Sequence, residues 1–193
     1  MANALIVGGP NGAGKSTFAR EYLREKDWRY LSADRIAAEI NPDHPEDAKI
    51  QAGRAFVRRF DRSIEQREDI VVESTLAGKG IGRMLERLQE AGYTIDIVFI
   101  FLSTPDACVQ RVRERVQRGG HDVPRPDVIR RFFRSVANFW DEYRYLTDRW
   151  YLFSNDEEEF QEVAFGEGPE YVVTDEHQFD TFFTIRAKAR DRE

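Results

Sequence analysis

The chain has 193 residues, of which 41% are hydrophobic and 33% charged, enough for one domain with a substantial core. The formal net charge of −6 argues against an extended nucleic-acid-binding surface. A single cysteine, Cys108, excludes a disulfide framework, and with three scattered histidines it gives no zinc-site spacing. No apolar run approaches the roughly 20 residues of a membrane helix, and a strand at the N-terminus leaves no room for a signal peptide. We therefore expect a cytoplasmic protein without membrane contact, for which nucleic acid is an unfavoured partner.

Short apolar runs alternate with amphipathic stretches up to about residue 155, as in an α/β domain with a parallel sheet. Strands are predicted over residues 4–7, 28–31, 70–72, 94–102 and 151–153. Helices are predicted over residues 17–24, 46–66, 80–91, 105–118 and 127–146. The aromatic residues of the last helix are expected to pack in the core rather than to stack on bases. The acidic remainder of the chain shows no regular pattern, and no linker divides residues 1–193, which we predict to be a single domain.

The segment from Gly9 to Ser16 has the spacing G-x-x-x-x-G-K-[ST] of a phosphate-binding P-loop, and it lies between a predicted strand and a predicted helix. Its glycines let backbone N–H groups turn toward an anion, and the following helix adds its positive N-terminal end. Lys15 is expected to reach the β- and γ-phosphates of a nucleoside triphosphate, and the Ser16 hydroxyl to bind magnesium. The predicted nucleotide-binding residues are Gly9, Pro10, Asn11, Gly12, Ala13, Gly14, Lys15, Ser16 and Thr17.

Polar residues also follow the second and third predicted strands, at the carboxyl edge where open parallel sheets bind ligands. Asp34 is the best candidate for a general base that accepts the proton of an acceptor alcohol. The alternative is that Asp34 caps the helical turn over residues 34–40. Glu73 is expected to bind a substrate hydroxyl or to hold magnesium through water, with an ordinary strand-end charge as the alternative. Ser74 and Thr75 are weaker candidates for substrate contact.

Arginines cluster on the two predicted helices that flank the glycine pair at residues 119–120. Three of them are spaced so that they share one helix face. Two such helices are typical of a kinase lid, here residues 111–135, which closes over the γ-phosphate, supplies positive charge and excludes water. The alternative is a solvated basic helix face. The arginines are Arg111, Arg115 and Arg118 on the first helix and Arg130, Arg131 and Arg134 on the second.

Three further sequence motifs follow the P-loop along the chain. They are Ser32-Ala33-Asp34, then Val72-Glu73-Ser74-Thr75-Leu76, then the string Arg111-Val112-x-x-Arg115-x-x-x-Gly119-Gly120-His121-x-Val123-Pro124 with Ile129-x-Arg131 and Arg134-Ser135 after it. With these motifs the chain resembles the zeta-toxin-like P-loop kinases over roughly residues 4–155.

The resemblance implies a P-loop NTPase fold with a parallel five-stranded sheet of order 2-3-1-4-5, flanked by helices and carrying a helical lid. It implies ATP and magnesium as cofactors, an aspartate base that matches Asp34, and lid arginines at the γ-phosphate that match Arg115 and Arg118 best. The best-known members phosphorylate the 3′-hydroxyl of a UDP-linked N-acetyl sugar and are held in check by a small antitoxin. A sugar-nucleotide acceptor and an antitoxin partner are therefore implied by the resemblance alone.

The residues together predict an ATP-dependent kinase that phosphorylates a hydroxyl of a small molecule, with Lys15, Asp34, Arg115 and Arg118 as catalytic residues. Two alternatives stay open. A polynucleotide 5′-hydroxyl kinase is disfavoured by the acidic composition. A nucleotide-hydrolysing switch or ATPase fits poorly, because no N-K-x-D segment occurs and the most apolar strand ends in Phe101-Leu102-Ser103 rather than in an acidic residue.

Overall fold

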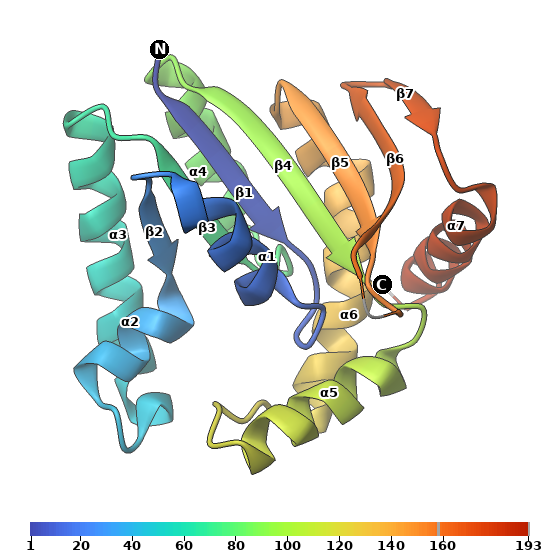
Figure 1. Cartoon of the computed structure of the whole chain (residues 1–193), viewed down its shortest axis with the longest axis horizontal. Helices are drawn as coiled ribbons and strands as arrows, with labels where there is room; N and C mark the ends of the chain where they lie inside the picture. Colours follow the sequence, from blue (N-terminus) through green and yellow to red (C-terminus); the bar gives the residue numbers. More distant parts are fainter. Residues whose placement is uncertain (158, 193) are drawn as a thin grey trace.

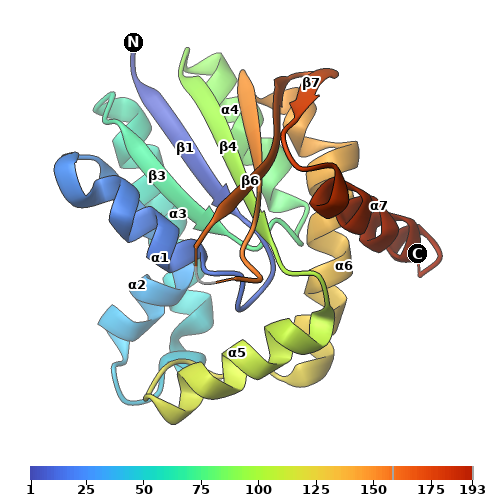
Figure 2. The ribbon, with the colours of Figure 1, turned by 45° about the vertical axis from the view of Figure 1, so that its right-hand side comes forward.

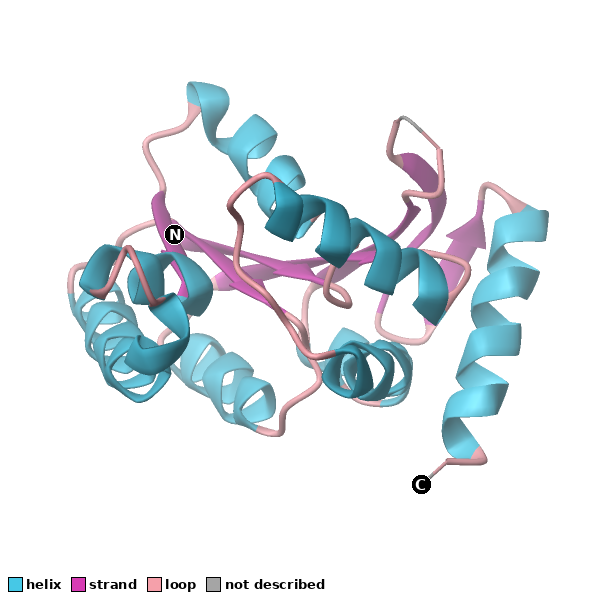
Figure 3. Cartoon of the chain, turned by 90° about the horizontal axis from the view of Figure 1, so that it is seen from below, coloured by secondary structure: helices cyan, strands magenta, loops and turns pink. Residues whose placement is uncertain are grey.

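A seven-stranded sheet with helices on both faces runs through the computed structural model, which describes residues 1–157 and 159–192 (Figure 3). The first five strands pair in parallel in the order β2-β3-β1-β4-β5, which confirms the expected order. The sheet order continues through β6 and β7, so the expectation of five strands is wrong. The strands are β1 (Asn3–Gly8), β2 (Arg29–Ser32), β3 (Ile70–Ser74), β4 (Thr94–Phe101), β5 (Arg149–Ser154), β6 (Gln161–Glu167) and β7 (Glu170–Val173).

Helices cover the two faces of the sheet because each presents an apolar side to it. On one face, α1 packs Phe18, Ala19 and Tyr22 against the strands. On the other face, residues of α4, α6 and α7 form the larger core. No helix within the described ranges is both long and apolar enough to cross a membrane. The helices are α1 (Lys15–Tyr22), α2 (Ala33–Ile40), α3 (Lys49–Glu65), α4 (Gly80–Glu90), α5 (Pro105–Gln117), α6 (Arg125–Asp141) and α7 (Glu176–Arg190).

The aromatic residues of helix α6, and Tyr143 in the turn after it, pack in the core, as expected. Phe132, Phe139 and Tyr143 are fully buried, and Phe139 stacks on Phe99 of β4 with ring centroids 4.5 Å apart. The predicted extension of this helix to residue 146 is wrong, because α6 ends at Asp141 and a separate 3-10 turn follows over Tyr143–Leu146. Similarly, α3 begins at residue 49 after a 3-10 turn over Pro45–Ala48.

The C-terminal region is regular, contrary to expectation. Strands β6 and β7 form an antiparallel hairpin that extends the sheet from β5, and α7 packs against α6. Gly168 makes the hairpin turn with φ of +52°, and the Asp175 side chain caps α7 by accepting a hydrogen bond from the Gln178 N–H at 3.0 Å. These two strands were not predicted because they are short and largely exposed. Acidic residues therefore interrupt the alternation of apolar and polar residues that marks a strand.

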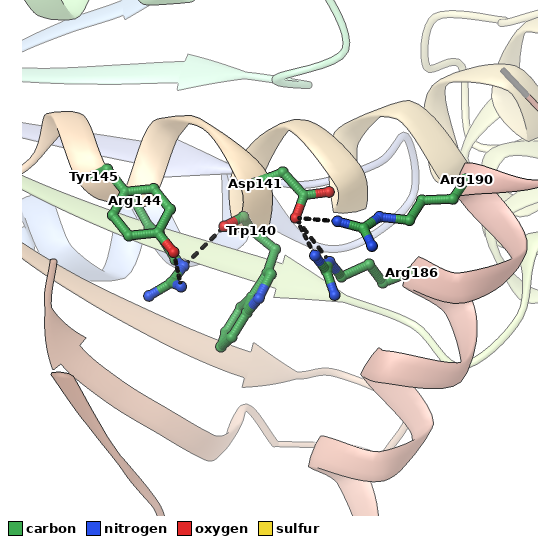
Figure 4. A network of polar contacts seen from close by, with 6 residues as sticks. All are labelled: Trp140, Asp141, Arg144, Tyr145, Arg186 and Arg190. Atoms are coloured by element: carbon green, nitrogen blue, oxygen red, sulfur yellow. Dashed lines mark hydrogen bonds and ion pairs between the residues drawn. The ribbon is translucent and has the colours of Figure 1, made fainter. Parts of the chain in front are cut away.

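Two side chains, those of Asp141 and Arg144, make polar contacts to this C-terminal region (both are drawn in Figure 4). Asp141, at the end of α6, pairs with Arg186 and Arg190 of α7. Arg144 is only 4% exposed and donates hydrogen bonds to the carbonyls of Trp140 at 2.8 Å and of Gly168, in the hairpin turn, at 2.6 Å. The Arg144 guanidinium carbon also lies 4.2 Å from the centroid of a Trp140 ring. Arg144 therefore joins α6 to the hairpin.

Replacing Arg144 with Met should lower the free energy of unfolding by about 2–4 kcal/mol, because it removes a cation–π contact and both Arg144 hydrogen bonds to backbone carbonyls, which leaves the Gly168 carbonyl with only the Trp150 indole N–H, 3.2 Å away, among the described donors. Urea denaturation followed by circular dichroism measures this loss. The matched control is Arg190→Met, which removes an exposed ion pair in which a guanidinium nitrogen lies 3.5 Å from a carboxylate oxygen of Asp141. This variant should lower the free energy of unfolding by less than about 1 kcal/mol. Equal stabilities for the two variants would contradict a structural role for Arg144.

The parallel strands place the predicted site at one edge of the sheet. Strands β1 and β4 point toward α5, which crosses beyond their carboxyl ends (Figure 1). Helix α2 borders the same edge (Figure 2). This edge is where the loops after β1, β2 and β3 meet.

Candidate active site

The loop between β1 and α1 has the backbone that a P-loop requires. Gly9 has φ of +142°, and a Cβ there would lie 2.1 Å from the carbonyl oxygen of Ile100 on β4, so only glycine fits. Gly14, the residue before α1, is left-handed with φ of +96°, and it has no side chain that could cover the helix N-terminus. The first backbone N–H groups of α1 are thus open to an anion.

Lys15 is the first residue of α1 and is 7% exposed. Its ammonium group donates a hydrogen bond to the carbonyl of Pro10 at 2.9 Å, which folds the side chain back along the loop. Burial lowers the pKa of Lys15, while the nearby carboxylates of Glu73 and Asp34 act in the opposite direction. The site therefore holds a desolvated cation between the phosphate-binding loop and two carboxylates.

Glu73 lies beside the P-loop because β3 pairs with β1 in the register Val7 to Glu73. Its carboxylate accepts a hydrogen bond from the Ser16 hydroxyl, with distances of 2.9 and 3.0 Å to its two oxygens. The Tyr30 hydroxyl on β2 donates to the same carboxylate. Burial, together with the charge of Glu73, raises the pKa of Tyr30, so the phenol remains a donor. Tyr30 was not predicted as a site residue.

Asp34 lies in the first turn of α2, just after β2, and its side chain is exposed. The capping alternative for Asp34 is wrong, because Ser32 is the N-cap of α2 and accepts a hydrogen bond from the Arg35 N–H at 3.4 Å. Among the residues that the structure describes, none donates a hydrogen bond to the Asp34 carboxylate. Its oxygens are therefore free to accept a proton or a hydroxyl group.

Two hollows meet at these residues. The first, which we name the P-loop cleft, has a volume of about 1560 Å³ and lies between the P-loop, α5 and the loop after β5. The second, which we name the arginine cavity, has a volume of about 430 Å³ and lies at the ends of β2 and β3. Lys15, Asp34 and Glu73 line both. A group bound in one hollow can therefore reach a group bound in the other at these three side chains.

The six arginines are divided between the two hollows. The structure brings Arg111, Arg115 and Arg118 to the P-loop cleft, whereas Arg130, Arg131 and Arg134 line the arginine cavity together with Thr75. The basic residues of the two predicted lid helices thus line different hollows, and the assignment of residues 111–135 to a lid stays a prediction. Helices α5 and α6 extend in different directions from their connecting loop (Figure 1), so their basic faces meet different spaces.

Within the P-loop cleft the arginines differ in their contacts. Arg111 donates to the carbonyl of Asn155 at 2.6 Å. Arg115 donates to the carbonyl of His121 at 2.7 Å, and its Nε is buried without a hydrogen-bond partner. Arg118 lines the cleft and is exposed. Arg115 therefore carries an unsatisfied donor, whereas Arg111 is engaged in the fold.

Asn155, which directly follows β5, was not predicted as a site residue. Its side chain is buried and donates to the carbonyl of Ala13 in the P-loop at 2.8 Å. A Cβ on Gly14 would lie 2.5 Å from the same amide nitrogen. Asn155 thus links the P-loop to β5 and, through Arg111, to α5.

Thr75 lies in the loop between β3 and α4, which forms a wall of the arginine cavity. The next residue, Leu76, is buried with φ of +56°, a left-handed conformation that is costly for leucine. Asn138 of α6 donates to the Leu76 carbonyl at 2.8 Å, and Tyr143 donates to the Gly78 carbonyl at 2.9 Å. These contacts hold the loop, and Thr75 with it, in place.

A parallel sheet of order β2-β3-β1-β4-β5 with a P-loop after β1 and an acidic residue at the end of β3 defines a P-loop kinase-like domain. The family model AAA_33, described as an AAA domain, matches residues 5–136, and the chain belongs to this family. An uncharacterized protein of Haemophilus influenzae is 32% identical over 120 residues, which are 62% of this chain and 85% of that protein.

Solved structures support the same fold. A chain of the AvrRxo1-ORF1:AvrRxo1-ORF2 complex, crystallised with sulphate ions, superposes with a TM-score of 0.73 at 17% identity over 94% of this chain. This chain spans 63% of that one. A chain of the PezAT chromosomal toxin-antitoxin system of Streptococcus pneumoniae gives a TM-score of 0.63 at 13% identity, covering 98% of this chain and 87% of its own length. The fold implied by the resemblance to zeta-toxin-like kinases is thus confirmed.

Proposed function

We propose that this protein is an ATP-dependent kinase that transfers the γ-phosphate to a hydroxyl group of a small molecule. The observation that carries the proposal is that Lys15 and Asp34 line both the P-loop cleft and the arginine cavity. ATP in the cleft and an alcohol in the cavity would therefore meet between a cation and a free carboxylate.

The P-loop cleft suits a nucleoside triphosphate. Lys15 and the N-terminus of α1 supply positive charge at the phosphate position. The unpartnered Nε of Arg115 would find an acceptor in a phosphate oxygen. We infer that Arg115 and Arg118 contact the γ-phosphate and that residues 111–135 form the lid of the site.

Magnesium fits the donor set beside the P-loop. In the described ranges no three His, Cys, Asp or Glu side chains are close enough to form a protein cage for a metal. This agrees with Mg²⁺, which usually binds through one or two protein oxygens, water and substrate phosphates. Ser16 would hold the ion directly and Glu73 through water. When bound, the ion would neutralise charge on the phosphate oxygens.

In the transfer step, the acceptor oxygen forms a bond to the γ-phosphorus while the bond from that phosphorus to the β–γ bridging oxygen breaks. Asp34 accepts the proton that leaves the acceptor hydroxyl, and ADP leaves with the bridging oxygen. Lys15, Arg115 and Arg118 stabilise negative charge on the transferring group. The products are ADP and a phosphate monoester.

The arginine cavity favours an acceptor that itself carries negative charge. Arg134 lines the cavity and, among the described residues, has no ion-pair partner, and Arg131 makes one 3.4 Å contact to the Asn11 side chain. Guanidinium groups bind phosphates in a bidentate geometry. A UDP-linked N-acetyl sugar, the acceptor implied by the resemblance, combines a diphosphate with free hydroxyls and is the first compound to test. An antitoxin partner is a further proposal that rests on the resemblance.

Incubating the protein with ATP, magnesium and a panel of metabolites, with sugar nucleotides tried first, tests the proposal by mass spectrometry. The expected product is one metabolite heavier by a phosphate group, with ADP formed in equal amount. Transfer to the 5′-end of an oligonucleotide would instead support the polynucleotide kinase alternative. ADP and free phosphate with no phosphorylated acceptor would support an ATPase and contradict the kinase proposal.

Replacing Arg115 with Ala should lower kcat by about 10- to 100-fold with little change in the Kd of ATP, because the guanidinium is proposed to act on charge that develops in the transition state. Steady-state kinetics and nucleotide titration separate the two effects. Arg113→Ala is the matched control, since Arg113 lies on the same helix, is exposed and does not line the cleft. A loss confined to ATP affinity would show that Arg115 only binds nucleotide.

A further inference from the structure

The two carboxylates between the hollows differ in how they are held. Asp34 is exposed, and no hydrogen bond to it comes from the described part of the chain. Glu73 is half-buried and accepts from two hydroxyl groups, those of Ser16 and Tyr30. Two carboxylates in different surroundings can take different roles in one reaction. The difference here depends on Tyr30, a residue of β2 to which neither the motifs nor the proposed reaction gives a role.

Tyr30 is placed for this contact by the sheet. Strand β2 pairs with β3 in the register Tyr30 to Val71 and Ser32 to Glu73, so the Tyr30 ring extends along the sheet toward the Glu73 carboxylate. The ring packs in the apolar cluster under α1, and the Arg35 guanidinium lies 5.5 Å from its centroid. The hydroxyl therefore reaches Glu73 from a side chain that is fixed by packing.

We propose that Tyr30 is a positioning residue that fixes the Glu73 carboxylate beside the Ser16 hydroxyl and thereby maintains the binding position for the divalent ion. A carboxylate held by two donors keeps one orientation, whereas a free one rotates about its side-chain bonds. With Glu73 engaged in this way, Asp34 is left as the carboxylate that can accept the proton of the acceptor. The inference rests on the metal site proposed above but not on the transfer reaction.

The test measures metal binding rather than turnover. Mn²⁺ is titrated into the protein saturated with a non-hydrolysable ATP analogue, and free Mn²⁺ is followed by electron paramagnetic resonance. Tyr30→Phe keeps the ring and removes the hydroxyl, so the Kd of Mn²⁺ should rise about 10- to 100-fold, the scale of one lost hydrogen bond to a charged group. The affinity for the analogue without metal should stay unchanged, because Tyr30 does not line the P-loop cleft.

Tyr22→Phe is the matched control, since Tyr22 packs in the same cluster against Trp28 and its hydroxyl makes no hydrogen bond within the described ranges. It should bind Mn²⁺ as the wild type does. Glu73→Gln should weaken Mn²⁺ binding, and adding Tyr30→Phe to it should cause little further loss, because Tyr30 acts through Glu73. Wild-type Mn²⁺ affinity in Tyr30→Phe, or additive losses in the double variant, would overturn the inference. A wild-type protein that binds no Mn²⁺ would overturn the metal site as well, whether or not transfer occurs.

Discussion

Replacing Lys15 with Ala should reduce turnover of ATP by about 10³-fold or more, and it should also weaken ATP binding. The effect is large because Lys15 is a buried cation at the proposed phosphate position, and a preorganised charge in a water-poor site stabilises the transferring group strongly. Phosphate oxygens bound there would also face the carboxylates of Asp34 and Glu73 without the cation between them. Coupled-enzyme detection of ADP measures the loss of turnover, and calorimetric titration measures the loss of affinity.

Lys188→Ala is the control for the Lys15 variant, because Lys188 is exposed on α7 and lines neither hollow. Circular dichroism should show that both variants remain folded. Undiminished turnover in Lys15→Ala would remove the P-loop from the proposed active site, and with it the assignment of the P-loop cleft to ATP.

Replacing Asp34 with Asn should lower phosphate transfer by about 10²–10⁴-fold while ATP affinity stays close to that of the wild type. The amide has nearly the shape of the carboxylate but cannot accept the proton of the acceptor alcohol. The helix should not be disturbed, because the cap of α2 is Ser32 and not Asp34. Transfer is measured on the acceptor that the metabolite screen identifies, and ATP affinity is measured without it.

The matched control for this variant is Asp43→Asn, an exposed loop aspartate that lines neither hollow. It should transfer phosphate at the normal rate. If Asp34→Asn also transferred at that rate, Asp34 would not be the base. An equal fall in transfer and in bare ATP hydrolysis would point to a role at the nucleotide instead.

Much of the fold could be predicted because the first five strands contain short apolar runs. These runs do not show the 3.6-residue spacing of apolar residues that is typical of an amphipathic helix. Strand β4 is the clearest case, with Ile97, Phe99 and Phe101 fully buried. The hairpin of β6 and β7 was not predicted because part of it faces solvent and so lacks a continuous apolar side. Val172 is 54% exposed and Tyr171 is 44% exposed. A pattern of alternation is weak in strands of four to seven residues that also carry glutamates.

The sequence by itself determined the P-loop, because that motif needs only a local spacing of glycines, a lysine and a serine between a strand and a helix. Only the tertiary structure decided which carboxylate is held and which is free, and which arginines reach which hollow. Those outcomes depend on the register that brings Glu73 beside Ser16 and Tyr30, and on the directions of α5 and α6. The register is non-local, since it arises from pairing between segments about forty or more residues apart in the chain, and α5 likewise contacts the distant Asn155 through Arg111.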